Sequence, residues 1–249
     1  MQSADGTTIA FDRSGSGPAL VLVVGAFCDR SSTKTLAAGL ASTFTVYEFD
    51  RRGRGESGDA SPYAVEREVE DLAAVIRAAG GSAFVFGHSS GGALALEAAA
   101  SGVPIRALVV HEPPYTEGPS YAFAEHLAEL NAAGRESDTV VAFLKLMGTP
   151  DAAIEQMKSG PYFSHMTSFA GPLVYDIRLC NGGEVPVERL QHISAPTLAL
   201  AGEKSAGWAA DVARAVASAV PNGQSRVLQG QNHGVADEVL IPLLNEFFV

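Results

Sequence analysis

The feature that most constrains this chain is an apolar run that leads through glycines directly into a helix-like run. Residues 83–86 read AFVF, residues 87–92 read GHSSGG, and the alanine-rich residues 93–100 follow. Small residues let a strand and the next helix approach closely, and the sharp turn between them holds Ser89 at the carboxyl end of the strand. This G-x-S-x-G setting predicts an exposed catalytic serine. The glycine spacing centres on Ser89 rather than Ser90.

Strand-like and helix-like segments alternate over the first 110 residues. Apolar or alternating runs predict strands at 7–12, 19–24, 44–49, 83–86 and 107–110. Between the third and fourth strands, the sequence predicts a helix with Ser61 as its cap and Pro62 as its first residue. Its apolar face would comprise Val65, Val69, Leu72 and Ile76. Such alternation favours right-handed βαβ crossovers and a mostly parallel sheet with helices on both faces.

The pattern changes between residues 115 and 193. Helix-like segments follow one another there, at 121–134, 139–147 and 151–160. The earlier alternation resumes with a strand at 196–201, a helix at 209–219, a strand at 226–228 and a closing helix. A chain that leaves a sheet and returns to it is typical of an insertion. We therefore expect one domain over residues 1–249, with 115–193 as a helical lid.

Composition and charge restrict the partners that this chain could have. There are 17 Lys and Arg against 28 Asp and Glu, a net charge of -11, so a nucleic-acid partner is not expected. The two cysteines lack C-x-x-C spacing, which argues against a disulfide framework or a thiolate zinc site. No leader pattern or membrane-length apolar run is present. We expect a cytoplasmic protein without a membrane partner, and a homo-oligomer is compatible with the sequence.

A serine hydroxyl becomes a good nucleophile only when a base takes its proton. His233 lies in the polar stretch QGQNHG at 229–234, between the last predicted strand and the last helix. That position is at the sheet edge where the turn at Ser89 also opens. His126 and His165 fall in the helical insertion, and His192 precedes the return to the sheet. His233 is therefore the expected base.

The order of elbow serine, helical insertion and late loop histidine resembles that of the α/β-hydrolase superfamily. The resemblance extends over residues 7–249. It implies the α/β-hydrolase fold and a carboxylate that orients the histidine and stabilises its cationic form. Family members commonly place this acid after the strand at 196–201, where this chain reads GEKS and has Ser205 in place of an aspartate. A hydroxyl cannot stabilise an imidazolium as a carboxylate does.

The stretch VHEPP at 110–114 offers a carboxylate for this role. Two prolines close an apolar strand directly after Glu112, and a charge at a buried strand end is costly unless it is paired. In haloalkane dehalogenases and zearalenone-type lactonases, the acid follows the strand after the elbow helix, which is the position of Glu112. The resemblance thus implies Glu112 as the acid. Glu203 is the alternative, and a solvated loop residue is the third interpretation.

The resemblance also implies two backbone N–H donors for the oxyanion of a tetrahedral intermediate. One is the N–H of Ser90, directly after the nucleophile. The other comes from the loop VGAFCDR at 24–30, where Ala26 is the expected donor and Phe27 the alternative. Relatives often begin this loop with His-Gly, whereas this chain has Val24 before the glycine.

Other conspicuous residues are interpreted as structural. Arg51, Arg52 and Arg54 form a short basic patch after a strand and are expected in a solvated loop rather than an anion site. Cys28 is interpreted as a packing residue. A third glycine is missing from the G-x-G at 15–17, and no phosphate-loop lysine or second zinc-ligating histidine follows. No cofactor and no metal are expected.

These residues together predict a serine hydrolase that cleaves a small-molecule carboxylic ester or lactone through an acyl-enzyme. The same triad could support acyl transfer, perhydrolysis, carbon–carbon bond cleavage or a lyase reaction. A non-catalytic ligand-binding relative is the alternative outside enzymes. A serine nucleophile argues against dehalogenation and epoxide opening, for which related enzymes use an aspartate.

Overall fold

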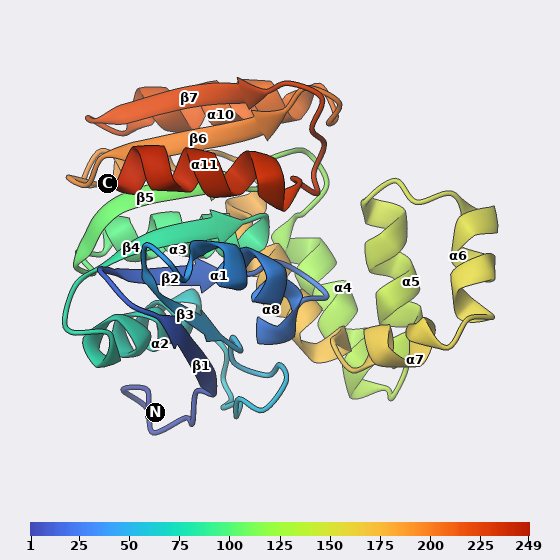
Figure 1. The fold of residues 1–249 in the computed structure, drawn as a ribbon. Helices are drawn as coiled ribbons and strands as arrows, with labels where there is room; N and C mark the ends of the chain where they lie inside the picture. Colours follow the sequence, from blue (N-terminus) through green and yellow to red (C-terminus); the bar gives the residue numbers. More distant parts are fainter.

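Seven strands form one sheet in the order β1-β3-β2-β4-β5-β6-β7 in the computed structural model, which describes residues 1–249 (Figure 1). The strands are β1 Phe11–Gly15, β2 Ala19–Val23, β3 Thr45–Phe49, β4 Ala83–His88, β5 Ile105–His111, β6 Thr197–Gly202 and β7 Gly223–Leu228. β1 pairs with β3 antiparallel, and all other neighbours are parallel. The predicted fold class is confirmed, and the carboxyl ends of β2 to β7 share one edge.

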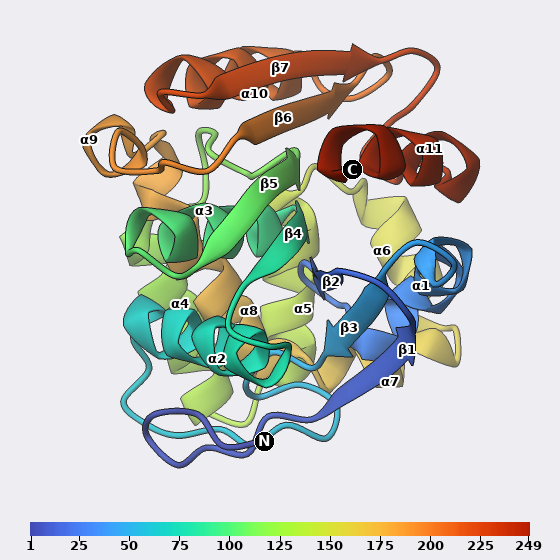
Figure 2. The ribbon, with the colours of Figure 1, turned by 60° about the vertical axis from the view of Figure 1, so that its left-hand side comes forward.

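Helices cover both faces of the sheet (Figure 2). One face carries α1 Lys34–Leu40 and α11 Asp237–Phe248, and the other carries α2 Val65–Ala78, α3 Ser90–Ala100, α9 Val187–Leu190 and α10 Trp208–Ala219. Successive side chains of a strand point to opposite faces. In β2, Leu20 and Leu22 therefore join the core under α1 and α11, while Val21 and Val23 join the core under α2 and α3.

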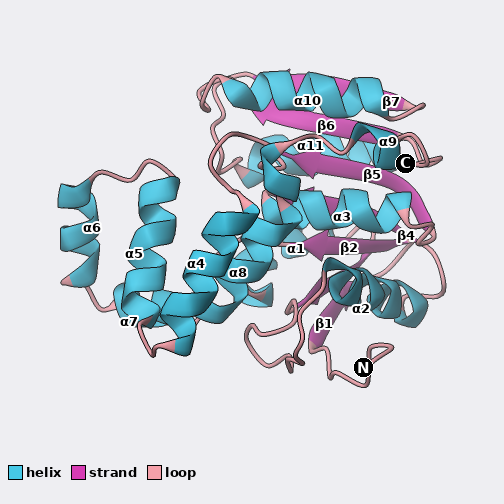
Figure 3. Ribbon diagram, turned by 180° about the vertical axis from the view of Figure 1, so that it is seen from behind, coloured by secondary structure: helices cyan, strands magenta, loops and turns pink.

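Most of the segment between β5 and β6 is helical and lies beyond the carboxyl ends of the strands (Figure 3), and only its last helix, α9, packs on a face of the sheet. Its helices are α4 Tyr121–Ala132, α5 Glu136–Leu146, α6 Asp151–Lys158, α7 Tyr162–Thr167 and α8 Ala170–Leu179, and the short η2 Asn181–Gly183 follows. Leu127, Phe143 and Leu173 belong to a core of their own within these helices. The helix-rich interval predicted at 115–193 is thus present.

The start of helix α2 corrects the sequence-based prediction. The helix begins at Val65 with Ala64 as its N-cap, so Ser61 and Pro62 lie in the preceding loop. The ring of Tyr63 stacks on Tyr175 of the helical segment, with centroids 3.8 Å apart. This contact between distant parts of the chain holds the residues before α2 in a non-helical conformation, against the local signal.

The first strand also begins later than predicted. β1 starts at Phe11 rather than at Thr7. The preceding residues instead form a short turn, in which the N–H of Ser3 donates to the carbonyl of Thr7 and an isolated bridge joins Gln2 to Thr8. The alternating pattern at 7–12 therefore covers a turn and only the first two of the five residues of the strand.

The helices are short. The longest, α2, has 14 residues, which at the rise of an α-helix corresponds to about 21 Å. None of the helices combines the length and the apolar character needed to cross a membrane.

Candidate active site

Ser89 occupies a sharp turn between β4 and α3. Its backbone has φ 55° and ψ −128°, a conformation that costs a non-glycine residue about 1–3 kcal/mol and is held only by tight surroundings. A Cβ on Gly87 would lie 2.6 Å from the carbonyl oxygen of Gly91, and one on Gly91 would lie 2.3 Å from that of Val23. These two glycines are therefore required by the close approach of strand and helix, and the predicted strand–turn–helix arrangement is present.

Strain is concentrated around this turn. Three of the four non-glycine residues with positive φ are Phe27, Ser89 and Glu112, at 57°, 55° and 49°. They follow the carboxyl ends of β2, β4 and β5, which are neighbours in the sheet. Clustering of strained backbone is typical of functional sites, where the surrounding fold maintains an unfavourable local conformation.

Glu112 and His233 form a close pair at the same edge. The Glu112 side chain is 1% exposed, and His233 Nδ1 lies 2.6 Å from Glu112 Oε2. Because a carboxylate only accepts hydrogen bonds, Nδ1 carries the hydrogen and donates it. The other ring nitrogen, Nε2, is then free to accept a proton.

Two further donors hold the Glu112 carboxylate. The hydroxyl of Ser205 donates to Oε1 at 2.5 Å, and the backbone N–H of Gly202 donates to the same oxygen at 2.7 Å. Burial raises the pKa of Glu112, but the hydrogen bonds from His233, Ser205 and Gly202 outweigh it and lower the pKa to about 2. Glu112 is therefore an anion at neutral pH, and its buried charge is paired.

Glu203, the alternative acid, lies elsewhere. It is exposed, and its Oε2 accepts the backbone N–H of Gly230 at 2.8 Å. The structure thus brings His233 to Glu112 and not to Glu203. The role of Ser205 was not predicted: it stands where relatives have an acid, and its hydroxyl donates to the carboxylate of Glu112.

Backbone hydrogen bonds join Ser89 to the strand that ends just before Glu112. The N–H of Ser89 donates to the carbonyl of His111 at 2.9 Å, and the N–H of Glu112 donates to Leu200 on β6 at 3.0 Å. The one hydrogen bond of the His233 imidazole is that to Glu112, so the ring is not hydrogen-bonded to Ser89 Oγ. In unliganded enzymes, catalytic hydrogen bonds are often long and tighten only in the substrate complex.

His88 connects β4 to the loop that carries His233. Its Nε2–H donates to the backbone carbonyl of His233 at 2.8 Å, and its ring stacks on His111 with centroids 5.5 Å apart. Burial and then the neighbouring His233 lower the pKa of His88 to about 4, and burial and then His88 lower the pKa of His111 to about 3. Both rings are neutral at neutral pH, and His88 holds the position of the loop.

The loop after β2 lies against the nucleophile. A Cβ on Gly25 would be 2.8 Å from the Cβ of Ser89 and 3.4 Å from its Oγ, so only glycine permits this approach. Ala26 follows directly. Ser90 is the first residue of α3, where a backbone N–H has no partner within the helix and the helix dipole favours negative charge. Both expected oxyanion donors therefore belong to segments beside Ser89.

The three arginines after β3 contradict the prediction of a solvated loop. Arg51, Arg52 and Arg54 are 0%, 0% and 2% exposed. Most of their partners are carboxylates on two helices, namely Glu68 and Asp71 on α2 and Asp176 on α8, and Arg52 also pairs with Asp5 near the N-terminus. The prediction was wrong because it considered the basic residues without the distant acidic ones that neutralise them.

Part of this network of buried arginines and carboxylates could have been predicted from the sequence of α2. Glu68 and Asp71 are three residues apart on α2, beside the apolar face that was predicted from the periodicity. A carboxylate that becomes buried beside such a face requires a cationic partner. Asp176 lies among apolar residues in α8 and carries no comparable signal.

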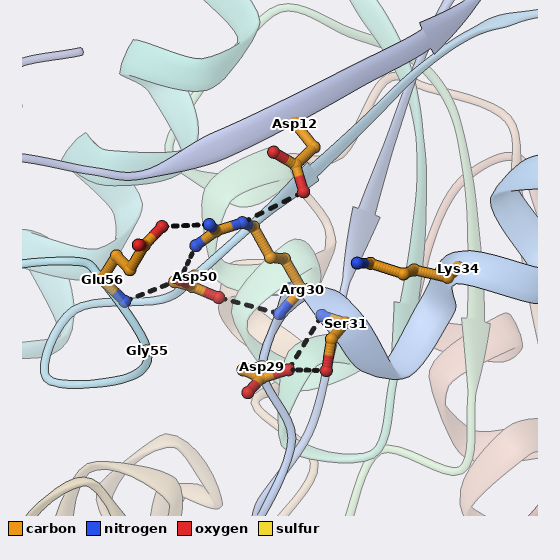
Figure 4. A pocket seen from close by; sticks show the side chains of 8 residues that line it. All are labelled: Asp12, Asp29, Arg30, Ser31, Lys34, Asp50, Gly55 and Glu56. Atoms are coloured by element: carbon orange, nitrogen blue, oxygen red, sulfur yellow. Dashed lines mark hydrogen bonds and ion pairs between the residues drawn. The ribbon is translucent and has the colours of Figure 1, made fainter.

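The turn that carries these arginines has a second, exposed face (Figure 4). Asp50 and Gly55 line a polar surface pocket in which Arg30 is ion-paired with Asp12, Asp50 and Glu56. No grouping of three His, Cys, Asp or Glu side chains suited to a metal ion occurs in the structure.

Comparisons with known proteins agree with this geometry. Residues 20–239 match the sequence model of a family described as the alpha/beta hydrolase family. The chain belongs to this family. The predicted superfamily is confirmed. A solved alpha/beta hydrolase from Sphaerobacter thermophilus is 46% identical, with a TM-score of 0.92, and the alignment covers 100% of this chain and 99% of that one.

Two other proteins that resemble this chain are more distant from it. N-formylmaleamate deformylase from Pseudomonas putida is 36% identical over 104 residues, which are 40% of this chain and 39% of the deformylase. The chain thus matches about two fifths of the length of this curated relative. A thermophilic esterase from Thermogutta terrifontis shares the fold, with a TM-score of 0.77 and 21% identity over 99% of this chain and 95% of that one.

Proposed function

We propose that this alpha/beta hydrolase cleaves a carboxylic ester or lactone of a small molecule through an acyl-enzyme intermediate. Ser89 is the nucleophile, His233 the general base and Glu112 the acid that orients the base. The supporting observation is the 2.6 Å hydrogen bond between His233 Nδ1 and Glu112 Oε2, at the strand edge where the strained turn presents Ser89.

The chemistry follows from this arrangement. His233 Nε2 takes the proton of Ser89 Oγ as the oxygen attacks the acyl carbon, and the N–H groups of Ala26 and Ser90 stabilise the resulting oxyanion. Collapse of the tetrahedral intermediate breaks the bond to the alcohol oxygen, which receives the proton from His233. A water molecule then gives a proton to His233 and attacks the acyl carbon; as the bond to Ser89 Oγ breaks and the acid leaves, His233 returns that proton to Ser89 Oγ.

The ionised Glu112 stabilises the imidazolium that forms twice in this cycle. Its pKa of about 2 keeps it negative throughout, because it already accepts hydrogen bonds from Ser205 and Gly202. The same bond holds His233 in the tautomer whose Nε2 can accept a proton.

We also propose that residues 1–249 form one domain and that 115–193 acts as a lid over the site. Supporting this, the ring of Phe27, in the loop expected to carry the oxyanion donor, contacts Phe143 and Phe169 of the helical segment at centroid distances of 5.4 and 6.4 Å. A substrate bound at Ser89 would then lie between the sheet edge and these helices.

Hydrolysis of an N-formyl or other N-acyl bond is a second candidate. It is favoured by the 36% identity over 104 residues with N-formylmaleamate deformylase. The same residues would serve, with His233 protonating a leaving nitrogen instead of an oxygen.

Short p-nitrophenyl esters, lactones and N-formyl amides test these proposals together. We expect a burst of p-nitrophenol equal to the enzyme concentration, and stoichiometric labelling by a serine-directed phosphonate that Ser89→Ala abolishes. Turnover of the N-formyl amides with little ester hydrolysis would favour the second candidate. Inertness towards all three substrate classes, with no labelling of Ser89, would overturn the assignment and favour a ligand-binding protein.

A further inference from the structure

We propose that Arg51 and Asp176 are positioning residues that hold both backbone donors of the oxyanion hole, so that helix α8 of the insertion fixes the geometry of the catalytic site. The inference rests on the proposed roles of Ala26 and Ser90. It concerns how those donors are held in place by buried groups that do not touch the substrate.

Asp176 meets the start of helix α3 directly. Its Oδ1 accepts the hydroxyl of Ser90 at 2.6 Å, Nη1 of Arg51 at 2.9 Å and Nη2 of Arg54 at 2.7 Å. Ser90 thus uses its side chain to bind α8 while its backbone N–H is left for the oxyanion. A carboxylate on the insertion therefore fixes the residue that supplies one donor.

Arg51 extends the same connection to the second donor. Its Nη1 lies 3.2 Å from both the carbonyl oxygen of Val24 and the hydroxyl of Ser90. Val24 begins the loop whose next residues are Gly25, beside Ser89, and Ala26. One guanidinium nitrogen therefore contacts the two segments that supply the oxyanion donors.

The packing around these contacts leaves little freedom. A Cβ on Gly91 would lie 2.6 Å from the carbonyl oxygen of Val24, so the loop and the first turn of α3 are already in contact. A displacement of either segment changes the distance between the two donors, and misplacement of catalytic groups by about 1 Å can cost 100-fold in rate.

The network is neutral as a whole. Arg51 and Arg54 are balanced by Asp176 and by Glu68, whose two oxygens accept from Arg51 at 2.7 and 2.9 Å. All four side chains are almost fully buried. Removing one charge leaves an uncompensated ion, which is strongly destabilising. A stability effect alone would therefore not distinguish positioning from a purely structural role.

The neighbouring pair Arg52 and Asp71 provides a matched control. Arg52 comes from the same turn as Arg51, its partner Asp71 lies on α2 as Glu68 does, both side chains are buried, and the pair forms two hydrogen bonds at 2.7 and 2.8 Å. Its other contacts are Asp5 and the carbonyl of Arg67, away from the nucleophile. Loss of this pair should weaken the fold without moving the oxyanion donors.

The test compares Asp176→Asn with Asp71→Asn in the full chain, using p-nitrophenyl acetate turnover, the rate of phosphonate labelling and the free energy of unfolding. Both variants should lose comparable stability. Only Asp176→Asn should lower kcat, by about 10- to 100-fold, with KM within twofold and labelling slowed in parallel. Restoring the carboxylate with Asp176→Glu should recover part of kcat.

Ser90→Ala is the second variant, because it removes the link to Asp176 without leaving a buried charge unpaired. We expect kcat to fall about 5- to 10-fold, in line with the net free energy of one hydrogen bond, with the fold retained. If Ser90→Ala keeps wild-type kcat, or if Asp176→Asn matches Asp71→Asn in kcat, the inference is wrong. A wild-type protein that neither turns over esters nor is labelled would instead refute the proposed function itself.

Discussion

Two buried carboxylates lie near the turn at Ser89, and they are neutralised in different ways. Glu112 accepts hydrogen bonds from neutral donors, namely the imidazole of His233, the hydroxyl of Ser205 and the N–H of Gly202. Asp176 accepts from two permanent cations, Arg51 and Arg54. Both are almost inaccessible to solvent.

The difference teaches what each carboxylate can do. An anion stabilised by dipoles retains its attraction for a positive charge that appears beside it, as happens when His233 takes a proton. An anion already balanced by arginines has no such charge to respond to, and its contribution is to hold segments together. We therefore expect Glu112 to affect the chemistry and Asp176 to affect stability and geometry.

The largest effect should come from neutralising the carboxylate beside His233. Glu112→Gln should lower kcat by about 10⁴-fold, as loss of the triad acid does in other serine hydrolases. Glu203→Gln is the control and should keep wild-type kcat, because Glu203 binds only the backbone of Gly230. Steady-state kinetics on p-nitrophenyl esters would measure both. The reverse outcome would falsify the assignment of the acid.

The free energy of unfolding should fall more when Asp176 is neutralised than when Glu112 is. Asp176→Asn should reduce the free energy of unfolding by about 3–5 kcal/mol, because it leaves a buried arginine without its counter-charge. Glu112→Gln should cost about 1 kcal/mol, since the amide oxygen can still accept from Ser205 and Gly202. Urea denaturation monitored by circular dichroism would give both values. Equal losses would remove the distinction between the two carboxylates.

The pH dependence of stability isolates the charge on Glu112. Its pKa falls from 4.5 in the unfolded chain to about 2 in the fold, so the unfolded state binds more protons in this interval. The stabilisation is complete above about pH 4.5 and is lost as the pH falls towards 2. The contribution should be about 2 kcal/mol smaller at pH 3 than at pH 6.

Urea denaturation of the wild type and Glu112→Gln at these two pH values measures that contribution. The free energy of unfolding of the wild type minus that of the variant should fall by about 2 kcal/mol from pH 6 to pH 3, which would make the variant the more stable protein at pH 3. A constant difference between the two proteins would show that Glu112 is not ionised in the fold.

The smallest effect concerns the support of His233. His88→Phe removes the hydrogen bond to the backbone of His233 and should lower kcat about 3- to 10-fold with KM little changed, in line with the net free energy of one hydrogen bond. His88→Gln retains a donor and should restore part of the rate. An unchanged kcat for His88→Phe would show that the loop is held by other contacts.

The sequence predicted the proposed catalytic residues better than the buried contacts that hold them in place. The turn at Ser89 could be recognised because its strand, glycines and helix are contiguous. Glu112 and His233 are 121 residues apart, and each by itself looks like a loop residue. Their pairing was inferred from resemblance to a family rather than from local pattern. The hydrogen bond from Ser205 to Glu112 was not predicted either, because these residues are 93 positions apart in the chain.

The support of the site escaped sequence analysis because charge pairing is not a local property. Arg51 lies 17 residues from Glu68 and 125 from Asp176, and a basic turn read by itself resembles a solvated loop. Tyr63 likewise stacks on Tyr175 and displaces the start of α2 from the predicted Ser61.

The sequence by itself determined the parallel sheet and the strained serine turn, since periodicity, glycine spacing and strand–helix alternation act between residues that are close along the chain. Only the tertiary structure decided which carboxylate meets His233 and which meets the arginines. Burial makes an unpaired charge prohibitive, so each ion must find its partner across the fold, and that choice is made by three-dimensional packing rather than by order along the chain.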